Sequence, residues 1–287
     1  MDAAGVPAGV FNLVQGDDPG VGVPLAGHAD VDTISFTGST RAGIDIARNA
    51  APTVKRVTQE LGGKSPDIVL DDEAFTENVG KGVTSMMGNS GQTCSAPSRM
   101  LVPAARVGEA IAIARETASG ITVGDPHGDF AMGPVVSGAQ FEKIQELIQK
   151  GIDEGATLVA AGTGRPDGLE KGYYVKPTVF ARVTNDMTVA REEIFGPVVT
   201  ILGYDSVDHA VEIANDTEYG LAGYGAGADL EKARAVARRI RADGSRSTTP
   251  STSAVRSAGT RRAATGGSGA SSASTTIWRP REFSARG

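Results

Sequence analysis

The alternation of short apolar runs with amphipathic helical stretches constrains the fold of this chain most strongly. Residues 30–37 alternate apolar and polar side chains, as a strand requires, and lead through a glycine-containing turn into a helical stretch. Further along, residues 141–154 place Ile144, Leu147 and Ile148 on one helical face. Strands that alternate with helices in this way form largely parallel sheets covered by helices. We therefore expect an α/β fold.

Cys94 is the only cysteine among the 287 residues, so it cannot form a disulfide within the chain. A single cysteine is most often a small buried hydrophobic side chain, and this is the plain interpretation. Here small and polar neighbours would let a substrate approach the thiol. A nucleophile needs a base, and Glu60 stands before two glycines in a turn, whereas the three histidines lie in polar loops or on a helix face. The pattern favours a Cys94–Glu60 pair over a cysteine–histidine pair.

Three motifs follow one another along the chain. They are Gln-Glu-Leu-Gly-Gly-Lys-Ser at 59–65, Gly-Gln-Thr-Cys at 91–94 and Glu-Glu-Ile-Phe-Gly-Pro-Val at 192–198. In this order they resemble the NAD(P)-dependent aldehyde dehydrogenase superfamily, and the resemblance extends from near the N-terminus to about Arg241. It implies an aldehyde dehydrogenase-like fold, in which a partial Rossmann-type cofactor domain is followed by an α/β catalytic domain.

The resemblance also implies roles for individual residues. Cys94 would attack the aldehyde, and Glu60 would activate the water that hydrolyses the resulting thioester, a role that suits a carboxylate with a raised pKa. Glu193 would bind the nicotinamide ribose and Phe195 would pack beside the nicotinamide ring, which together fix one face of the hydride acceptor. The plainer alternatives are a capping or ion-paired surface carboxylate for Glu60 and a turn anchor for Phe195.

A turn at Gly38 and Ser39 lies between a predicted strand and a predicted helix, where backbone N–H groups and the helix dipole can receive a phosphate. The glycine spacing does not fit the G-x-G-x-x-G dinucleotide fingerprint, so the residues alone favour Ser39 as a helix N-cap. The resemblance implies instead that Gly38 and Ser39 meet the pyrophosphate of the cofactor, with Ser39 the better candidate. It does not distinguish NAD from NADP, and no metal ligands are expected.

The resemblance divides the chain into a partial dinucleotide-binding domain at 1–61, a catalytic domain at 62–242 and a low-complexity tail at 243–287. The tail contains ten Ser, seven Thr and seven Arg but no Leu and no Lys, a composition that cannot bury a core, so we expect it to be disordered. A frameshift in a GC-rich coding sequence is the favoured origin, and a Ser/Arg linker is the alternative. The chain is expected to be the C-terminal two-thirds of a family member.

Charge and composition restrict the function further. The formal net charge of −6 is concentrated in an acidic body that precedes the basic tail, which argues against nucleic-acid binding as the main function. We see no apolar run long enough to span a membrane and no secretory signal, so we expect a cytoplasmic protein. Family members are homo-oligomers, but the strand used in assembly has no counterpart in the tail, and we do not extend this property to the chain.

Three functions remain open. The first is oxidation of an aldehyde to a carboxylic acid with NAD or NADP, through a Cys94 thiohemiacetal and thioester, with a small-molecule aldehyde as the substrate. The second is an inactive remnant that binds a partner or a ligand. The third is a cofactor-independent thiol esterase that uses Cys94 and Glu60. The three ordered motifs favour the first.

Overall fold

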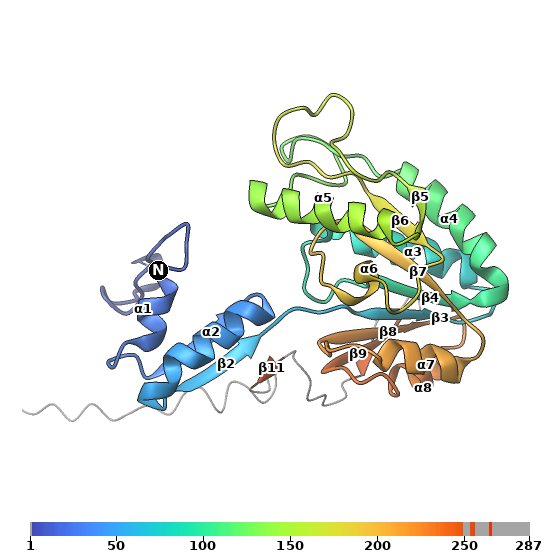
Figure 1. Cartoon of the computed structure of the whole chain (residues 1–287). Helices are drawn as coiled ribbons and strands as arrows, with labels where there is room; N and C mark the ends of the chain where they lie inside the picture. Colours follow the sequence, from blue (N-terminus) through green and yellow to red (C-terminus); the bar gives the residue numbers. More distant parts are fainter. Residues whose placement is uncertain (1, 249–252, 256–263, 266–287) are drawn as a thin grey trace, which may run out of the picture. The chain divides into compact units, whose positions relative to one another are not determined.

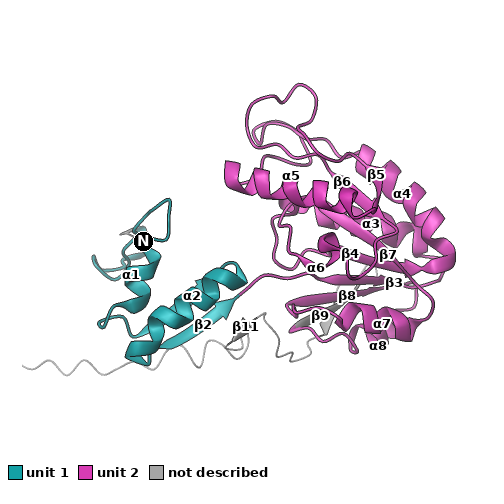
Figure 2. Ribbon diagram, in the orientation of Figure 1, with its two compact units in different colours: residues 1–60, 265–287 teal, residues 61–264 magenta. Residues whose placement is uncertain are grey.

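The computed structural model describes residues 2–248, 253–255 and 264–265 (Figure 1). The chain forms two compact units, which consist of residues 1–60 with 265–287 and of residues 61–264 (Figure 2). The domain boundary expected after residue 61 lies one residue from this division.

The first unit is built around two parallel strands joined by a helix. β1 (Thr33–Thr37) pairs with β2 (Arg56–Glu60), and Thr37 lies opposite Glu60. The helix α2 (Thr40–Ala50) packs against both strands and against α1. The strand order in this sheet is β1-β2-β11. The remaining short elements are η1 (Asp2–Ala4), α1 (Gly22–Gly27) and η2 (Ala51–Thr53). Of β11 (Ala264–Thr265), only Thr265 belongs to the first unit.

The second unit contains a sheet with the strand order β10-β9-β8-β3-β4-β7-β6-β5. Its strands are β3 (Pro66–Val69), β4 (Arg99–Pro103), β5 (Thr157–Ala160), β6 (Thr178–Ala181), β7 (Val198–Tyr204), β8 (Ala222–Ala226), β9 (Gly244–Thr248) and β10 (Ser253–Val255). Among the described strands of this sheet, β5 runs antiparallel to β6 and β10 to β9, and the other pairs are parallel. The central strands β3 and β4 are buried along their whole length, as expected for a parallel sheet covered on both faces.

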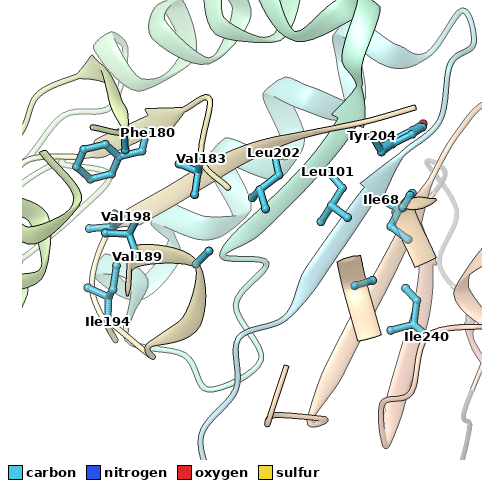
Figure 3. Close-up of a cluster of buried hydrophobic side chains, with 14 of the residues drawn as sticks. Ile68, Leu101, Phe180, Val183, Val189, Ile194, Val198, Leu202, Tyr204 and Ile240 are labelled. Carbon is cyan, nitrogen blue, oxygen red and sulfur yellow. The ribbon is translucent and has the colours of Figure 1, made fainter. Parts of the chain in front are cut away.

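Helices cover the two faces of this sheet. They are α3 (Phe75–Met87), η3 (Gly88–Gly91), η4 (Ala104–Arg106), α4 (Val107–Ser119), α5 (Gly138–Asp153), α6 (Thr188–Arg191), α7 (Val207–Asn215) and α8 (Leu230–Ala237). One hydrophobic cluster joins α3 and α4 to the sheet, and a second joins α5 to α8 to it. In the second cluster Ile68, Leu101 and Leu202 lie on neighbouring strands (Figure 3). The α/β fold expected from the sequence is therefore confirmed, and Ile144 and Ile148 of α5 are buried as predicted.

The segment expected to form a disordered tail contains the strands β9 and β10. β9 pairs in parallel with β8, with Gly244 opposite Ala222, and β10 returns antiparallel to β9. This differs from the structureless tail that the composition indicated at 243–287. Strand pairing uses backbone N–H and C=O groups, and the outer edge of β8 offers such groups whatever the side chains of its partner. The strand β11 also falls within this segment, and the part of the predicted tail that belongs to none of these strands lies, after Asp243, outside the described residues.

Candidate active site

The three sequence motifs meet because each stands immediately before a parallel strand. Residues 61–65 lead into β3, residues 92–98 into β4 and residues 193–197 into β7. These strands are neighbours in the order β3-β4-β7 and run in the same direction. Loops that enter parallel strands lie at the same edge of a sheet, so the motifs converge at the amino edge of this one.

The turn at Gly62 and Gly63 contacts both of the other motifs. A Cβ atom on Gly63 would collide with the carbonyl oxygen of Cys94, and a Cβ atom on Gly62 would overlap the carboxylate of Glu193. The Gly63 N–H donates a hydrogen bond to Glu193 Oε1 at 3.0 Å. Only glycine leaves room for approaches this close, which explains the two consecutive glycines in the motif.

Cys94 is half-buried and lies in a turn that follows η3. Just before it, Asn89, Ser90 and Gly91 have φ angles of +52°, +55° and +70°. Left-handed backbone costs free energy for residues other than glycine, and such residues gather at functional sites. The Ser90 hydroxyl donates a hydrogen bond to the Gly133 carbonyl at 2.8 Å, which helps to hold this strained turn in place.

Two more hydrogen bonds fix the residues on either side of Cys94. The Val136 N–H donates to Gln92 Oε1 at 2.8 Å. The Tyr224 hydroxyl, which comes from β8, donates to the Ser95 carbonyl at 2.8 Å. The cysteine loop is thus attached to the segment before α5 and to the strand β8, so the position of the thiol depends on residues far away in the sequence.

Glu193 is half-buried, and opposing effects act on its ionisation. Burial raises the pKa of the Glu193 carboxyl, whereas the Gly63 N–H, the Lys143 ammonium and the Lys64 ammonium act to lower it. Lys143 also donates a hydrogen bond from Nζ to the Glu193 carbonyl at 2.8 Å. The net result is a carboxyl group with a pKa above its ordinary value.

Phe195 lies two residues after Glu193, in a turn that is hydrogen-bonded to the helix α5. Its φ angle is +55°, and Gln140 Nε2 donates hydrogen bonds to the carbonyls of Ile194 at 2.9 Å and of Phe195 at 2.8 Å. One small cavity has walls from all three motifs, among them Gly63, Thr93 and Phe195. The structure therefore brings Phe195 close to the turn that contacts Glu193 and to the loop that carries the cysteine.

The remaining expected residues, Gly38, Ser39 and Glu60, belong to the first unit. Ser39 caps α2, because its hydroxyl accepts a hydrogen bond from the Ala42 N–H at 3.3 Å. The Gly38 N–H donates to the Glu60 carbonyl at 3.1 Å and is thereby occupied. Glu60 is half-buried at the end of β2. The helix-cap interpretation of Ser39 therefore matches the structure, and Ser39 still has its own hydroxyl proton to donate.

Sequence reasoning missed several residues of this site. Gln140 and Lys143 lie on α5, some fifty residues before the turn that they contact, and no local pattern connects them to it. Lys64 was part of a quoted motif, but its burial was not foreseen. It is only 2% exposed, and burial is the largest effect that lowers its pKa to about 7.

A larger cavity of about 1070 Å³ lies at the opposite edge of the sheet, where the same strands end. Asp71, Tyr204 and Asp229 are among its lining residues. Ligands of open α/β sheets usually bind at this carboxyl edge. None of the residues expected in the site lines this cavity, so in this chain the candidate site and the large cavity are separate.

Among the described residues, no group of three or more His, Cys, Asp and Glu side chains is arranged to hold a metal ion. No helix there is both long enough and apolar enough to cross a membrane.

Comparison with known proteins gives the family. The sequence pattern of the aldehyde dehydrogenase family matches residues 1–279, and the chain belongs to this family. A 3-succinoylsemialdehyde-pyridine dehydrogenase from a Pseudomonas species is 55% identical over 242 residues, which are 84% of this chain and 51% of that protein. The resemblance seen in the three motifs is thereby confirmed.

Solved structures agree with this assignment. A mutant of aldehyde dehydrogenase C from Pseudomonas syringae, in complex with NAD+ and octanal, has a TM-score of 0.87 and 51% identity, and the match covers 92% of this chain and 55% of that one. An aldehyde dehydrogenase from Mycobacterium tuberculosis in complex with NAD+ has a TM-score of 0.76 and 38% identity, with 84% of this chain and 50% of that one covered. The aldehyde dehydrogenase-like fold is therefore confirmed.

The extent of the match differs from the expectation in two respects. The chain spans about half the length of the relatives it matches, where two-thirds was expected. The family pattern continues to residue 279, beyond Arg241, where the resemblance was expected to end, although the alignment with the Pseudomonas dehydrogenase spans only 242 residues.

Proposed function

We propose that this chain carries the catalytic cysteine and part of the cofactor site of an NAD(P)-dependent aldehyde dehydrogenase, which oxidises an aldehyde to a carboxylic acid. The convergence of the Cys94 loop, the Gly62-Gly63 turn and Glu193 at one edge of the sheet carries this proposal. It is supported by relatives crystallised with NAD+, one of them together with octanal.

In this proposal the reaction begins at Cys94. Its thiolate attacks the carbonyl carbon of the aldehyde, and a bond from Sγ to carbon forms as the carbonyl oxygen becomes the oxygen of a thiohemiacetal. When it is bound, the nicotinamide supplies the acceptor for the hydride that leaves this carbon. Cys94 then carries the acyl group as a thioester. Because an ordinary thiol has a pKa of about 8.5, the site must favour the thiolate form of Cys94 before the attack.

Hydrolysis is assigned to Glu60. The carboxylate takes a proton from water, the resulting hydroxide attacks the thioester carbon, and the bond from carbon to Cys94 Sγ breaks to release the acid and the thiolate. Glu60 is three residues before Gly63 in the sequence, and Gly63 contacts the carbonyl of Cys94. This short separation in the sequence supports Glu60 as the base that activates water for hydrolysis of the Cys94 thioester.

The chemistry of the site suits a nicotinamide nucleotide. Glu193 accepts the Gly63 N–H at Oε1, and among the described residues Oε2 accepts no hydrogen bond, so the carboxylate has capacity for ribose hydroxyls. Phe195 offers an aromatic side chain for the nicotinamide ring. In the first unit the hydroxyl of Ser39, beside Gly38 at the start of α2, can donate its proton to a phosphate oxygen.

The test combines binding, labelling and turnover on the full 287-residue chain. We expect NADH to bind in a fluorescence titration, a thiol-reactive aldehyde analogue to label Cys94 faster than a free thiol, and octanal with NAD+ to yield NADH absorbance. The matched variant Cys94→Ala should retain NADH binding and lose labelling and turnover.

A folded chain that neither binds NADH nor oxidises octanal would overturn this function. If such a chain still hydrolysed an activated ester, and Cys94→Ala abolished that activity, the thiol esterase would take its place. The inactive remnant would be favoured if neither reaction occurred.

A further inference from the structure

Lys64 is a buried cation that the proposed reaction does not use. It is 2% exposed, and its Nζ has no hydrogen-bond partner among the described residues. Burying an ammonium group without an acceptor destabilises a folded protein. Proteins tolerate such a loss of folding stability mainly at functional sites, where the destabilising group serves binding or catalysis.

The neighbouring buried cation shows the contrast. Arg99 is 0% exposed, but its guanidinium donates to the Lys64 carbonyl at 3.0 Å, to Asn185 Oδ1 at 2.9 Å and to the carbonyls of Ile213 and Ala214 at 3.0 and 2.9 Å. Within the described part of the chain, the fold therefore supplies acceptors for the Arg99 guanidinium and none for the Lys64 ammonium. Arg99 also fixes the main chain of Lys64.

The location of Lys64 indicates which group it serves. It directly follows Gly63, whose N–H donates to the Glu193 carboxylate, and the same carboxylate lies against Gly62. Lys64 is thus the next residue after the turn on which this carboxylate rests.

The charges around Lys64 support the pairing. Burial and the Arg99 guanidinium lower the pKa of Lys64, as the Lys143 ammonium does to a lesser degree, whereas the Glu193 and Glu192 carboxylates raise it. In the other direction, Lys143 and Lys64 lower the pKa of Glu193 against the effect of burial. Lys64 and Glu193 therefore each favour the charged form of the other.

We propose that Lys64 is a positioning residue for the cofactor, whose buried ammonium keeps the Glu193 carboxylate ionised and directed at the ribose hydroxyls of the nicotinamide nucleotide. This inference rests on the proposed function, because it assigns Glu193 to the ribose. An ionised carboxylate only accepts hydrogen bonds and so matches hydroxyl donors. A cation acts more strongly on a neighbouring charge from a desolvated position than from water.

Loss of the Lys64 proton gives the inference a pH signature. Below about pH 7 Lys64 is charged and supports Glu193, and above that value it becomes neutral. The benefit of Lys64 for NADH binding should therefore be present at pH 6 and absent at pH 9. A lysine with a purely structural role would contribute to packing at both values.

The experiment is an NADH fluorescence titration of the full chain and of Lys64→Met, Glu193→Gln and the double variant at pH 6 and pH 9. We expect Lys64→Met to weaken NADH binding about tenfold at pH 6, which corresponds to about 1.4 kcal/mol, and to have little effect at pH 9. In the Glu193→Gln background it should have no further effect at pH 6. Lys64→Gln serves as a second variant should the methionine variant fail to fold.

An equal loss at both pH values, an equal loss in the Glu193→Gln background, or no loss at all would overturn the role of Lys64. Failure of the wild-type chain to bind NADH would instead overturn the proposed function. In that case the unfolding free energies of the same four proteins at pH 6 still test the Lys64–Glu193 pair, since additive effects would contradict any coupling between them.

Discussion

Replacing Lys64 by methionine should stabilise the second unit at neutral and acidic pH. Burial is the main reason that the pKa of Lys64 falls from 10.5 to about 7 in the folded chain. At 1.36 kcal/mol per pKa unit, this difference corresponds to about 5 kcal/mol of unfavourable free energy. Replacing a whole buried ion pair by apolar residues gains about 1–4 kcal/mol. Lys64→Met removes one cation and also loses its attraction to Glu193, so its gain is smaller than the full cost of burial. We expect a gain within that range at pH 6.

The sign of the pH dependence follows from the direction of the shift. The folded-state pKa of Lys64 lies below the unfolded value, so between about pH 7 and 10.5 the unfolded chain binds the additional proton. The stability of the wild-type chain should therefore rise with pH across this window relative to Lys64→Met. The advantage of the variant is complete below pH 7 and disappears near pH 10.5.

Urea unfolding followed by circular dichroism at pH 6 and pH 10 measures this effect. Lys171→Met, at an exposed lysine, is the matched control and should change little at either pH. The reasoning is refuted if Lys64→Met is less stable than the wild type at pH 6, or if its gain is the same at both pH values.

Three further outcomes are expected. Gly63→Ala places a Cβ atom against the Cys94 carbonyl, so it should lower the free energy of unfolding in urea by about 1–3 kcal/mol and slow alkylation of the thiol. An unchanged alkylation rate would contradict this contact. Arg99→Met leaves several buried acceptors without a donor and should lower stability by at least about 3 kcal/mol, which thermal unfolding would detect. Tyr224→Phe removes the hydrogen bond to the Ser95 carbonyl and should lower the free energy of unfolding by about 1 kcal/mol. It should also change the rate of Cys94 labelling measurably, and an identical rate would show that this bond does not position the cysteine.

The layout of the sheet and the motifs was accessible from the sequence because both depend on local patterns. Alternating apolar residues predicted β1, and the helical spacing of Ile144 and Ile148 predicted the buried face of α5. The order of the three motifs identified the family. Since each motif precedes a parallel strand, their meeting at one edge follows from the fold class itself.

The features that escaped prediction depend on long-range contacts or on the backbone. A lysine after two glycines looks like a solvated turn residue, and only the packing of the second unit reveals that Lys64 is buried. The hydrogen bonds from Gln140 to the Phe195 turn join positions that no local spacing connects. β9 was missed because side-chain composition gives no information on whether a backbone edge such as that of β8 will accept a partner.

The placement of the candidate site before the strands has a consequence for how such a chain can change. Lys64 stands two residues before β3, and Phe195 stands three residues before β7. With connections this short, a shift of either strand along its neighbours by a single residue would displace the site by a comparable distance. Substitutions inside the apolar strands β3 and β7 that shift their register would therefore alter the candidate site without touching any of its residues.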